Sequence, residues 1–166
     1  MKRCDFVLET ASPAETQAWG ARLAGLLAGG DAVALVGELG AGKTAFVQGL
    51  ARGLGIRAAV TSPTFILANQ YRTPAGRLLH HVDCYRLSDA AAEMWDVGLG
   101  DLFAGDDIVA IEWADRVAAL LPDEYLEIGF SYLDENRRRI CFSGHGGRFV
   151  GIVEQLARYG DSIAVS

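Results

Sequence analysis

The apolar residues of this chain follow two spacings, short continuous runs and a repeat of three to four positions. Continuous runs span residues 6–8, 31–36 and 107–112, and runs of this length are typical of β-strands. The run at 31–36, Asp-Ala-Val-Ala-Leu-Val, has the pattern of a strand buried on both faces. Residues 107–112 predict a second such strand, which ends in the carboxylate of Glu112.

Helical spacing predicts three longer helices. The first begins at a capping box, Ser12-Pro13-Ala14-Glu15, and the pair Gly29-Gly30 is expected to end it. The apolar stripes of the three helices are Trp19, Leu23, Leu26 and Leu27, then Val47, Leu50, Ala51 and Leu54, and finally Phe149, Ile152, Val153 and Leu156. Two shorter helices are predicted, one over 88–95 closed by Gly98 and one that ends at Leu121-Pro122.

Two β-hairpins complete the predicted elements. They join 65–71 to 78–85 through a turn at 73–76, and 125–132 to 138–142 through a tip at 134–136. The glycine-rich residues 143–147 are interpreted as a linker to the last helix.

Between the strand at 31–36 and the helix that follows lies Gly-Glu-Leu-Gly-Ala-Gly-Lys-Thr, residues 37–44. It matches the phosphate-loop pattern G-x-x-x-x-G-K-[ST], and the strand before it and the helix after it are the context this motif requires. We therefore expect one α/β domain over residues 1–166, a three-layer P-loop NTPase-like domain with a mixed parallel and antiparallel central sheet.

The residue types of the loop suit polyphosphate. Glycines let backbone N–H groups approach the phosphates, and the helix beginning near Lys43 adds its positive dipole end. Lys43 supplies a charge to the β- and γ-phosphates, and the Thr44 hydroxyl is the expected Mg²⁺ ligand. The residues assigned to ATP binding here are Gly37, Glu38, Leu39, Gly40, Ala41, Gly42, Lys43, Thr44 and Ala45.

Composition limits the function classes. The chain has 166 residues, 51% of them hydrophobic and 22% charged, which is typical of a globular protein. No apolar run is long enough to span a membrane, and the N-terminus does not have the pattern of a secretory signal. With a net charge of −6 and no basic stripe, contact with RNA is expected to be indirect or through a partner.

The three cysteines are Cys4, Cys84 and Cys141. Their odd number and wide spacing predict neither a disulfide framework nor a metal-ligand pair, which favours a reducing cytoplasm.

Two acids are candidates for the metal and the chemistry. Glu112 and Asp83 both lie near predicted strand ends, where a carboxylate could reach Mg²⁺ or orient an attacking water. We place Glu112 first for the metal because its strand is the more apolar, and a solvated strand-end acid remains the alternative for each. The neighbouring His80 and His81 point to opposite faces of a strand, so they cannot hold one metal together.

Three further features each allow two interpretations. The hydroxyl-rich loop Thr61-Ser62-Pro63-Thr64-Phe65 is either a polar connection or a switch that senses the γ-phosphate. Trp113 is either core or a cover for the nucleotide. The basic run 137–139 is either part of a solvated hairpin or functional. In the functional interpretation, one arginine contacts phosphate, for which we choose Arg138, or the run forms a contact surface for RNA or protein.

In their order and spacing, four motifs resemble the TsaE (YjeE) family, small bacterial P-loop ATPases required for threonylcarbamoyl modification of tRNA adenosine. They are residues 37–44, Ser-Pro-Thr-Phe at 62–65, His-Val-Asp-Cys-Tyr-Arg-Leu at 81–87 and Ile-Glu-Trp at 111–113. The resemblance extends from Thr10 to about Phe142. Cys84 stands where the family usually has leucine, a modest apolar change.

The resemblance implies ATP and Mg²⁺ as cofactors and two partners, a TsaD-like protein that transfers the threonylcarbamoyl group and a TsaB-like protein that supports it. Contact with tRNA is expected through that complex, and no contact with a membrane is expected because no apolar run is long enough to span one. Roles carried over by position are Mg²⁺ binding for Thr44 and Glu112, phosphate binding for Lys43, a switch at Ser62 and Thr64, and catalysis for Asp83. Lys43 and Thr64 are grouped with Asp83 as catalytic residues, and Trp113 is expected near the nucleotide.

Two other functions stay open at this stage. A P-loop kinase would phosphorylate a small molecule, although no arginine-rich lid is evident in the sequence. A GTP-binding switch would read guanine, but the chain has no Asn-Lys-x-Asp motif. Turnover of ATP without an acceptor, and a comparison of ATP with GTP binding, distinguish these from an ATPase.

Overall fold

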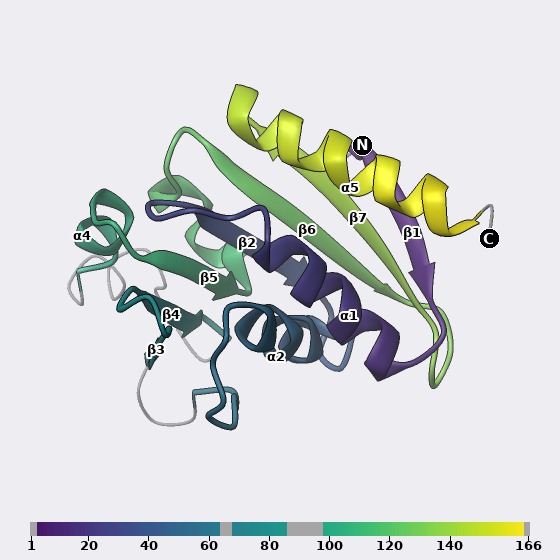
Figure 1. Cartoon of the computed structure of the whole chain (residues 1–166), viewed down its shortest axis with the longest axis horizontal. Helices are drawn as coiled ribbons and strands as arrows, with labels where there is room; N and C mark the ends of the chain where they lie inside the picture. The colour runs from purple at the N-terminus through teal and green to yellow at the C-terminus, as the bar shows by residue number, and fades with distance from the viewer. Residues whose placement is uncertain (1–2, 64–67, 86–97, 165–166) are drawn as a thin grey trace.

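A computed structural model describes residues 3–63, 68–85 and 98–164 of the chain. A seven-stranded mixed sheet forms its centre (Figure 1). The strands are β1 (Phe6–Thr10), β2 (Ala32–Gly37), β3 (Ala68–Arg72), β4 (Leu78–Asp83), β5 (Ile108–Glu112), β6 (Tyr125–Tyr132) and β7 (Arg138–His145). The helices are α1 (Pro13–Ala24), α2 (Lys43–Gly53), α4 (Leu99–Ala104), the 3₁₀ helix η1 (Ala114–Leu120) and α5 (Gly147–Ala164).

The order of the strands is β1-β7-β6-β2-β5-β4-β3. The four central strands β6, β2, β5 and β4 are parallel to one another, and antiparallel strands flank them on both sides. The carboxyl ends of β2, β4 and β5 therefore lie at the same edge of the sheet, which is where open α/β sheets bind their ligands. The predicted mixed sheet is confirmed, as is the central place of the two most apolar strands.

Helices cover both faces of the sheet, so the predicted three layers are present. On one face the apolar sides of α1, α2 and α5 pack in a large core that includes Leu23, Phe46 and Leu156. On the other face α4 and η1 pack in a smaller core, to which Leu99 and Val117 belong. The helices α1 and α2 approach each other so closely that a Cβ atom on Gly20 would collide with the backbone of α2.

The start of α1 agrees with the prediction, and its end does not. Ser12 accepts a hydrogen bond from the backbone N–H of Glu15 at 3.2 Å, and the Glu15 carboxylate accepts one from the N–H of Ala11 at 2.7 Å. The helix ends at Ala24 rather than at the Gly29-Gly30 pair. Leu26 and Leu27 lie beyond it but still pack against the core, which explains why their spacing suggested a longer helix.

The second hairpin is longer than predicted. β7 continues to His145, which pairs with Tyr125, so the prediction of a strand end at Phe142 followed by a linker over 143–147 is wrong. Gly144 belongs to the strand because α5 crosses it closely: a Cβ there would lie 2.5 Å from the backbone nitrogen of Val150. The glycines of this segment therefore serve close packing as well as the turn.

Two predicted features lie outside the described residues, the helix over 88–95 and the beginning of the strand over 65–71. In the described part of that hairpin, β3 and β4 pair antiparallel as predicted, and β4 ends at Asp83 instead of Tyr85. The predicted helix after Trp113 is the 3₁₀ helix η1. A search of the described residues for a helix able to cross a membrane finds none.

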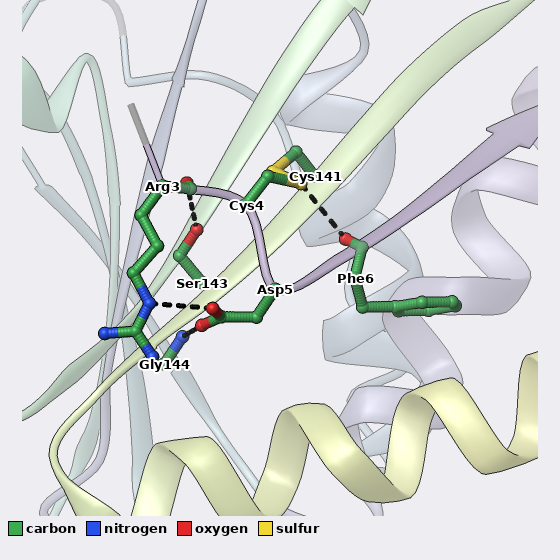
Figure 2. The surroundings of a disulfide bond; sticks show 7 residues. All are labelled: Arg3, Cys4, Asp5, Phe6, Cys141, Ser143 and Gly144. Carbon is green, nitrogen blue, oxygen red and sulfur yellow. Dashed lines mark hydrogen bonds and ion pairs between the residues drawn. A yellow bond between two sulfur atoms is a disulfide. The ribbon is translucent and has the colours of Figure 1, made fainter. Parts of the chain in front are cut away.

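The cysteine prediction is wrong, because Cys4 and Cys141 form a disulfide (Figure 2). They are 137 positions apart in sequence, but β1 pairs with β7 and brings the segment before Phe6 beside Cys141. Two hydrogen bonds add to this attachment: Ser143 Oγ donates to the carbonyl of Arg3 at 2.7 Å, and the Gly144 N–H donates to the Asp5 carboxylate at 3.0 Å. The argument from cysteine count to a reducing compartment is therefore lost.

Candidate nucleotide-binding site

The loop at 37–44 connects the carboxyl end of β2 to the amino end of α2, as the motif requires. Two of its glycines adopt left-handed backbone conformations, Gly40 with φ of 78° and Gly42 with φ of 104°. At Gly37 a Cβ would lie 2.6 Å from the carbonyl oxygen of Phe130. The loop conformation thus requires glycine at all three positions, and it leaves the N-terminus of α2 facing the pocket.

Lys43 is buried, and its ammonium group lies inside the curve of the loop. The Nζ atom donates to the carbonyl oxygens of Gly37 at 2.7 Å and Glu38 at 2.8 Å, and it lies 4.3 Å from the centre of the Trp113 ring. Burial lowers the pKa of Lys43, and the nearby Glu112 opposes that shift. A buried ammonium is costly unless it has partners, so this position favours an anionic ligand.

Thr44, Glu112 and Ser62 meet through their side-chain oxygens. The Thr44 hydroxyl donates to the Glu112 carboxylate, 3.0 Å from Oε1 and 3.1 Å from Oε2, and lies 2.9 Å from Ser62 Oγ. Hydroxyl and carboxylate oxygens are the ligands that Mg²⁺ prefers, and its sites in nucleotide-binding proteins combine one or two carboxylates with phosphate and water. The donor set therefore fits Mg²⁺. Among the described residues there is no larger cluster of His, Cys, Asp or Glu able to hold a metal ion.

Asp83 lies beside Glu112, because these two residues are paired in the parallel register of β4 and β5. Its Oδ1 accepts a hydrogen bond from the backbone N–H of Tyr85 at 2.9 Å. Burial raises the pKa of Asp83, and the negative charge of Glu112 raises it further. A carboxylate held in this way is poised to accept a proton at the edge of the pocket.

The two histidines separate to opposite faces, as strand alternation predicts. His80 Nε2 lies 2.9 Å from Asp107, whereas His81 Nε2 lies 2.5 Å from Glu112 Oε2 in a buried contact. Sequence analysis did not assign His81 to the site. The parallel pairing of β4 with β5 would have been needed to find it, since that pairing places His81 opposite Ala110, two residues before Glu112 on the same face.

Trp113 follows Glu112 with a left-handed backbone, φ 58° and ψ 39°, the only non-glycine residue among those described with a positive φ. Its ring lies 5.0 Å from that of Tyr85, measured between centroids, and over the Lys43 ammonium. Such a conformation in a bulky residue is costly and is found mostly at functional sites. Tyr85, which the sequence analysis did not assign, forms part of the same wall.

The three arginines of the basic run diverge. Arg137 pairs with Asp134 and Arg139 with Glu9, both at the surface. Arg138 instead donates to the carbonyl oxygen of Gly40 at 3.1 Å, so it alone of the three contacts the phosphate loop. Its guanidinium also lies 4.6 Å from the centre of the Tyr132 ring.

These side chains surround one pocket of about 570 Å³. Its lining includes most of the predicted site: Leu39, Gly40, Gly42, Lys43, Thr44, Ala45, Ser62, Asp83, Glu112, Trp113 and Arg138. Pro13, Thr16 and Asn136 also line the pocket, and the sequence analysis assigned none of them to the site. Thr64 lies outside the described residues.

Comparison with known proteins decides the family. The profile of the family described as "Threonylcarbamoyl adenosine biosynthesis protein TsaE" matches residues 10–140. The chain belongs to the TsaE family. The four motifs that suggested this resemblance all lie within the matched range.

Two TsaE proteins are similar to this chain over nearly their whole length. The protein named tRNA threonylcarbamoyladenosine biosynthesis protein TsaE of Bacillus subtilis is 39% identical over 151 residues, which is 90% of this chain and 92% of that protein. The protein of the same name from Treponema pallidum is 42% identical over 130 residues, 78% of this chain and 93% of its own.

A solved structure supports the same architecture. The crystal structure of YdiB from Bacillus subtilis superposes with a TM-score of 0.80, covers 96% of this chain and 99% of YdiB, and has 31% sequence identity. This chain and YdiB therefore have the same fold.

Proposed function

We propose that this protein binds and hydrolyses Mg²⁺–ATP as a component of the machinery that makes tRNA threonylcarbamoyladenosine, acting with a TsaD–TsaB pair. The observation that carries the proposal is the contact between Thr44 and Glu112 at the mouth of the phosphate loop. It joins the first nucleotide motif to an acid at the end of the neighbouring strand, within a chain of the TsaE family.

Binding of ATP would use the backbone of residues 37–44, with Ala45 behind it. The N–H groups at the start of α2 would donate hydrogen bonds to the phosphate oxygens, and Lys43 would exchange its two loop carbonyls for phosphate oxygens. Trp113 and Arg138 would bound the nucleotide on either side, since both line the pocket. Mg²⁺ would be held by Thr44 and Glu112, where it neutralises phosphate charge during transfer.

Hydrolysis would depend on Asp83. Its raised pKa and its position beside Glu112 suit a residue that orients the attacking water and accepts a proton. Lys43 would stabilise the charge that develops on the transferred phosphoryl group. We assign Ser62 and Thr64 to a switch, and Ser62 already contacts Thr44 at 2.9 Å.

Partner proteins would read this switch. Ser62 lies six residues before β3 in the chain, and β3 is at the edge of the sheet, so order imposed by the γ-phosphate can reach a docking partner there. With a net charge of −6, the chain is a poor ligand for tRNA by itself, and contact with tRNA through the complex is the simpler arrangement. We place the protein in the cytoplasm because its proposed substrate system acts on tRNA.

Reconstitution tests the proposal. Purified protein should hydrolyse ATP slowly with no acceptor present, which a small-molecule kinase should not do, and adding TsaD and TsaB together should raise the rate. GTP should replace ATP poorly. Absence of Mg²⁺-dependent hydrolysis, both alone and with the two partners, would contradict the assignment.

A further inference from the structure

The contact between His81 and Glu112 suggests a role that the nucleotide motifs do not include. His81 is fully buried on β4, two residues before Asp83, and Glu112 is 3% exposed at the end of β5. Asp83 pairs with Glu112, and residues two apart on a strand share a face, so His81 and Glu112 lie on the face covered by α2. The Nε2 atom of His81 lies 2.5 Å from Oε2 of Glu112.

The protonation site of His81 follows from its surroundings. Nδ1 is buried and has no hydrogen-bond partner among the described residues, so a proton there would be unpaired. We therefore place a proton on Nε2, which donates to Glu112 Oε2. Glu112 thus has two side-chain donors, His81 on Oε2 and Thr44 on both oxygens.

We propose that His81 is a positioning residue that fixes the Glu112 carboxylate in the orientation it needs to hold the cation of the bound nucleotide. This inference rests on the proposed Mg²⁺–ATP site. A glutamate side chain has several rotamers, and a cation bound through it loses affinity if the carboxylate must first be ordered. With a cation bound by Thr44 and Glu112, the Thr44 hydroxyl would no longer donate to the carboxylate, and His81 would remain as the side-chain donor that holds Oε2.

The adjacent histidine offers a matched control. His80 is also buried, its Nε2 lies 2.9 Å from a carboxylate oxygen of Asp107, and its Nδ1 is likewise without a partner among the described residues. The difference is the position of the partner. His80 contacts Asp107, which comes just before the first residue of β5, whereas His81 contacts Glu112, the last residue of that strand. If the two buried histidines matter only for the fold, replacing either of them should have the same effect on Mg²⁺ binding.

The experiment compares His81→Gln, His81→Asn and His80→Asn with the wild type. Glutamine places its amide nitrogen near the position of Nε2, whereas asparagine places it near Nδ1 and cannot reach Glu112. The readout is the Mg²⁺ concentration that half-saturates binding of a non-hydrolysable ATP analogue, followed by calorimetry and repeated with Mn²⁺ by electron paramagnetic resonance. Thermal unfolding checks that each variant is folded.

We expect His81→Asn to raise the half-saturating Mg²⁺ concentration about 10- to 100-fold, the effect usual for residues that orient metal ligands. His81→Gln should recover most of this loss, and His80→Asn should resemble the wild type. Equal Mg²⁺ midpoints in wild type and His81→Asn would overturn the inference. So would an equal shift in His80→Asn, or a shift in His81→Gln as large as that in His81→Asn.

A second measurement separates this inference from the proposed function. The second measurement is the free energy of unfolding of the protein without nucleotide. Wild type, His81→Asn, Glu112→Gln and the double variant form a double-mutant cycle, which gives the coupling energy between the two side chains. Coupling is expected, and its absence would overturn the positioning contact even where Mg²⁺–ATP binds normally. A wild type that binds no Mg²⁺–nucleotide would refute the proposed function and the metal role of His81, whatever coupling the cycle shows.

Discussion

The hydroxyl of Thr44 donates to both carboxylate oxygens of Glu112, at 3.0 and 3.1 Å, although 68 residues separate the two in sequence. The contact exists because β2 and β5 are adjacent and parallel, so that the phosphate loop after β2 meets the last residue of β5. If another strand lay between β2 and β5, Glu112 would be too far from Thr44 for this hydrogen bond. The geometry of the proposed metal site is therefore a property of the strand order.

Removal of the Lys43 ammonium should weaken nucleotide binding. A charge-assisted contact of this kind contributes about 1.5–3 kcal/mol, so Lys43→Ala should lose roughly 10- to 100-fold in ATP affinity or in turnover. Calorimetric titration with ATP and Mg²⁺ checks it. Arg52→Ala, which removes an exposed charge from the last turn of the same helix, is the control and should bind like the wild type. Equal affinity and turnover in Lys43→Ala would contradict the site.

The two acids should separate by the step they affect. Glu112→Gln should weaken Mg²⁺-dependent binding, because it replaces the carboxylate that faces Thr44. Asp83→Asn should bind ATP nearly as well as the wild type but hydrolyse it more slowly, on the order of 100-fold if Asp83 acts as general base. Binding isotherms and single-turnover hydrolysis distinguish these effects. The reverse pattern would exchange the two roles.

The environment of Asp83 also predicts that Asp83→Asn is more stable than the wild type, by an amount that depends on pH. Burial and Glu112 raise its pKa above the usual 3.8, so the ionised form is less favourable in the folded protein than in the unfolded chain. This cost is complete above the folded pKa and disappears as the pH falls below the unfolded value. Asp83→Asn should therefore raise Tm near pH 8, and this gain should shrink as the pH falls through the raised pKa of Asp83 toward the usual 3.8.

Melting curves of wild type and Asp83→Asn from pH 8 down to the usual pKa of 3.8 measure this difference in Tm. Asp161→Asn on the exposed end of α5 makes the same change in net charge and controls for it. A gain that is absent near pH 8, or that grows as the pH falls, would show that the fold does not disfavour the Asp83 carboxylate.

The disulfide between Cys4 and Cys141 should stabilise the attachment of β1 to β7. Disulfides typically contribute about 2–4 kcal/mol, so Cys4→Ser should lower Tm by several degrees under oxidising conditions. Under reducing conditions wild type and variant should melt together, and buried Cys84 should be the thiol that remains after oxidation. Thiol counting under denaturing conditions and melting curves test both points. Three free thiols in the oxidised protein would refute the bond.

The sequence determined the phosphate loop and its neighbours, because a glycine motif between a buried strand and an amphipathic helix depends only on local order. It also identified Glu112 as an acid at a strand end. It could not show that His81 would contact Glu112, since that contact depends on which strand pairs with β5. Pairing between distant strands is likewise what places Cys4 beside Cys141.

Local errors have local causes. The apolar spacing of α1 continues into Leu26 and Leu27, so the pattern did not reveal that the helix ends before them. Gly144 suggested a linker because glycine is typical of turns, whereas its role is to admit the backbone of α5 beside β7. The choice of Arg138 from the basic run is different, because nothing local in the sequence separates it from Arg137 and Arg139, and only its contact with Gly40 does so.

The measurement that tests the central claim most directly is the amount of threonylcarbamoyladenosine in bulk tRNA after depletion of this protein in its own cell. Nucleoside mass spectrometry should show a clear fall, restored by the wild-type chain and not by Lys43→Ala expressed at the same level. Unchanged threonylcarbamoyladenosine after full depletion would contradict the proposed function, even if the purified protein binds and hydrolyses ATP.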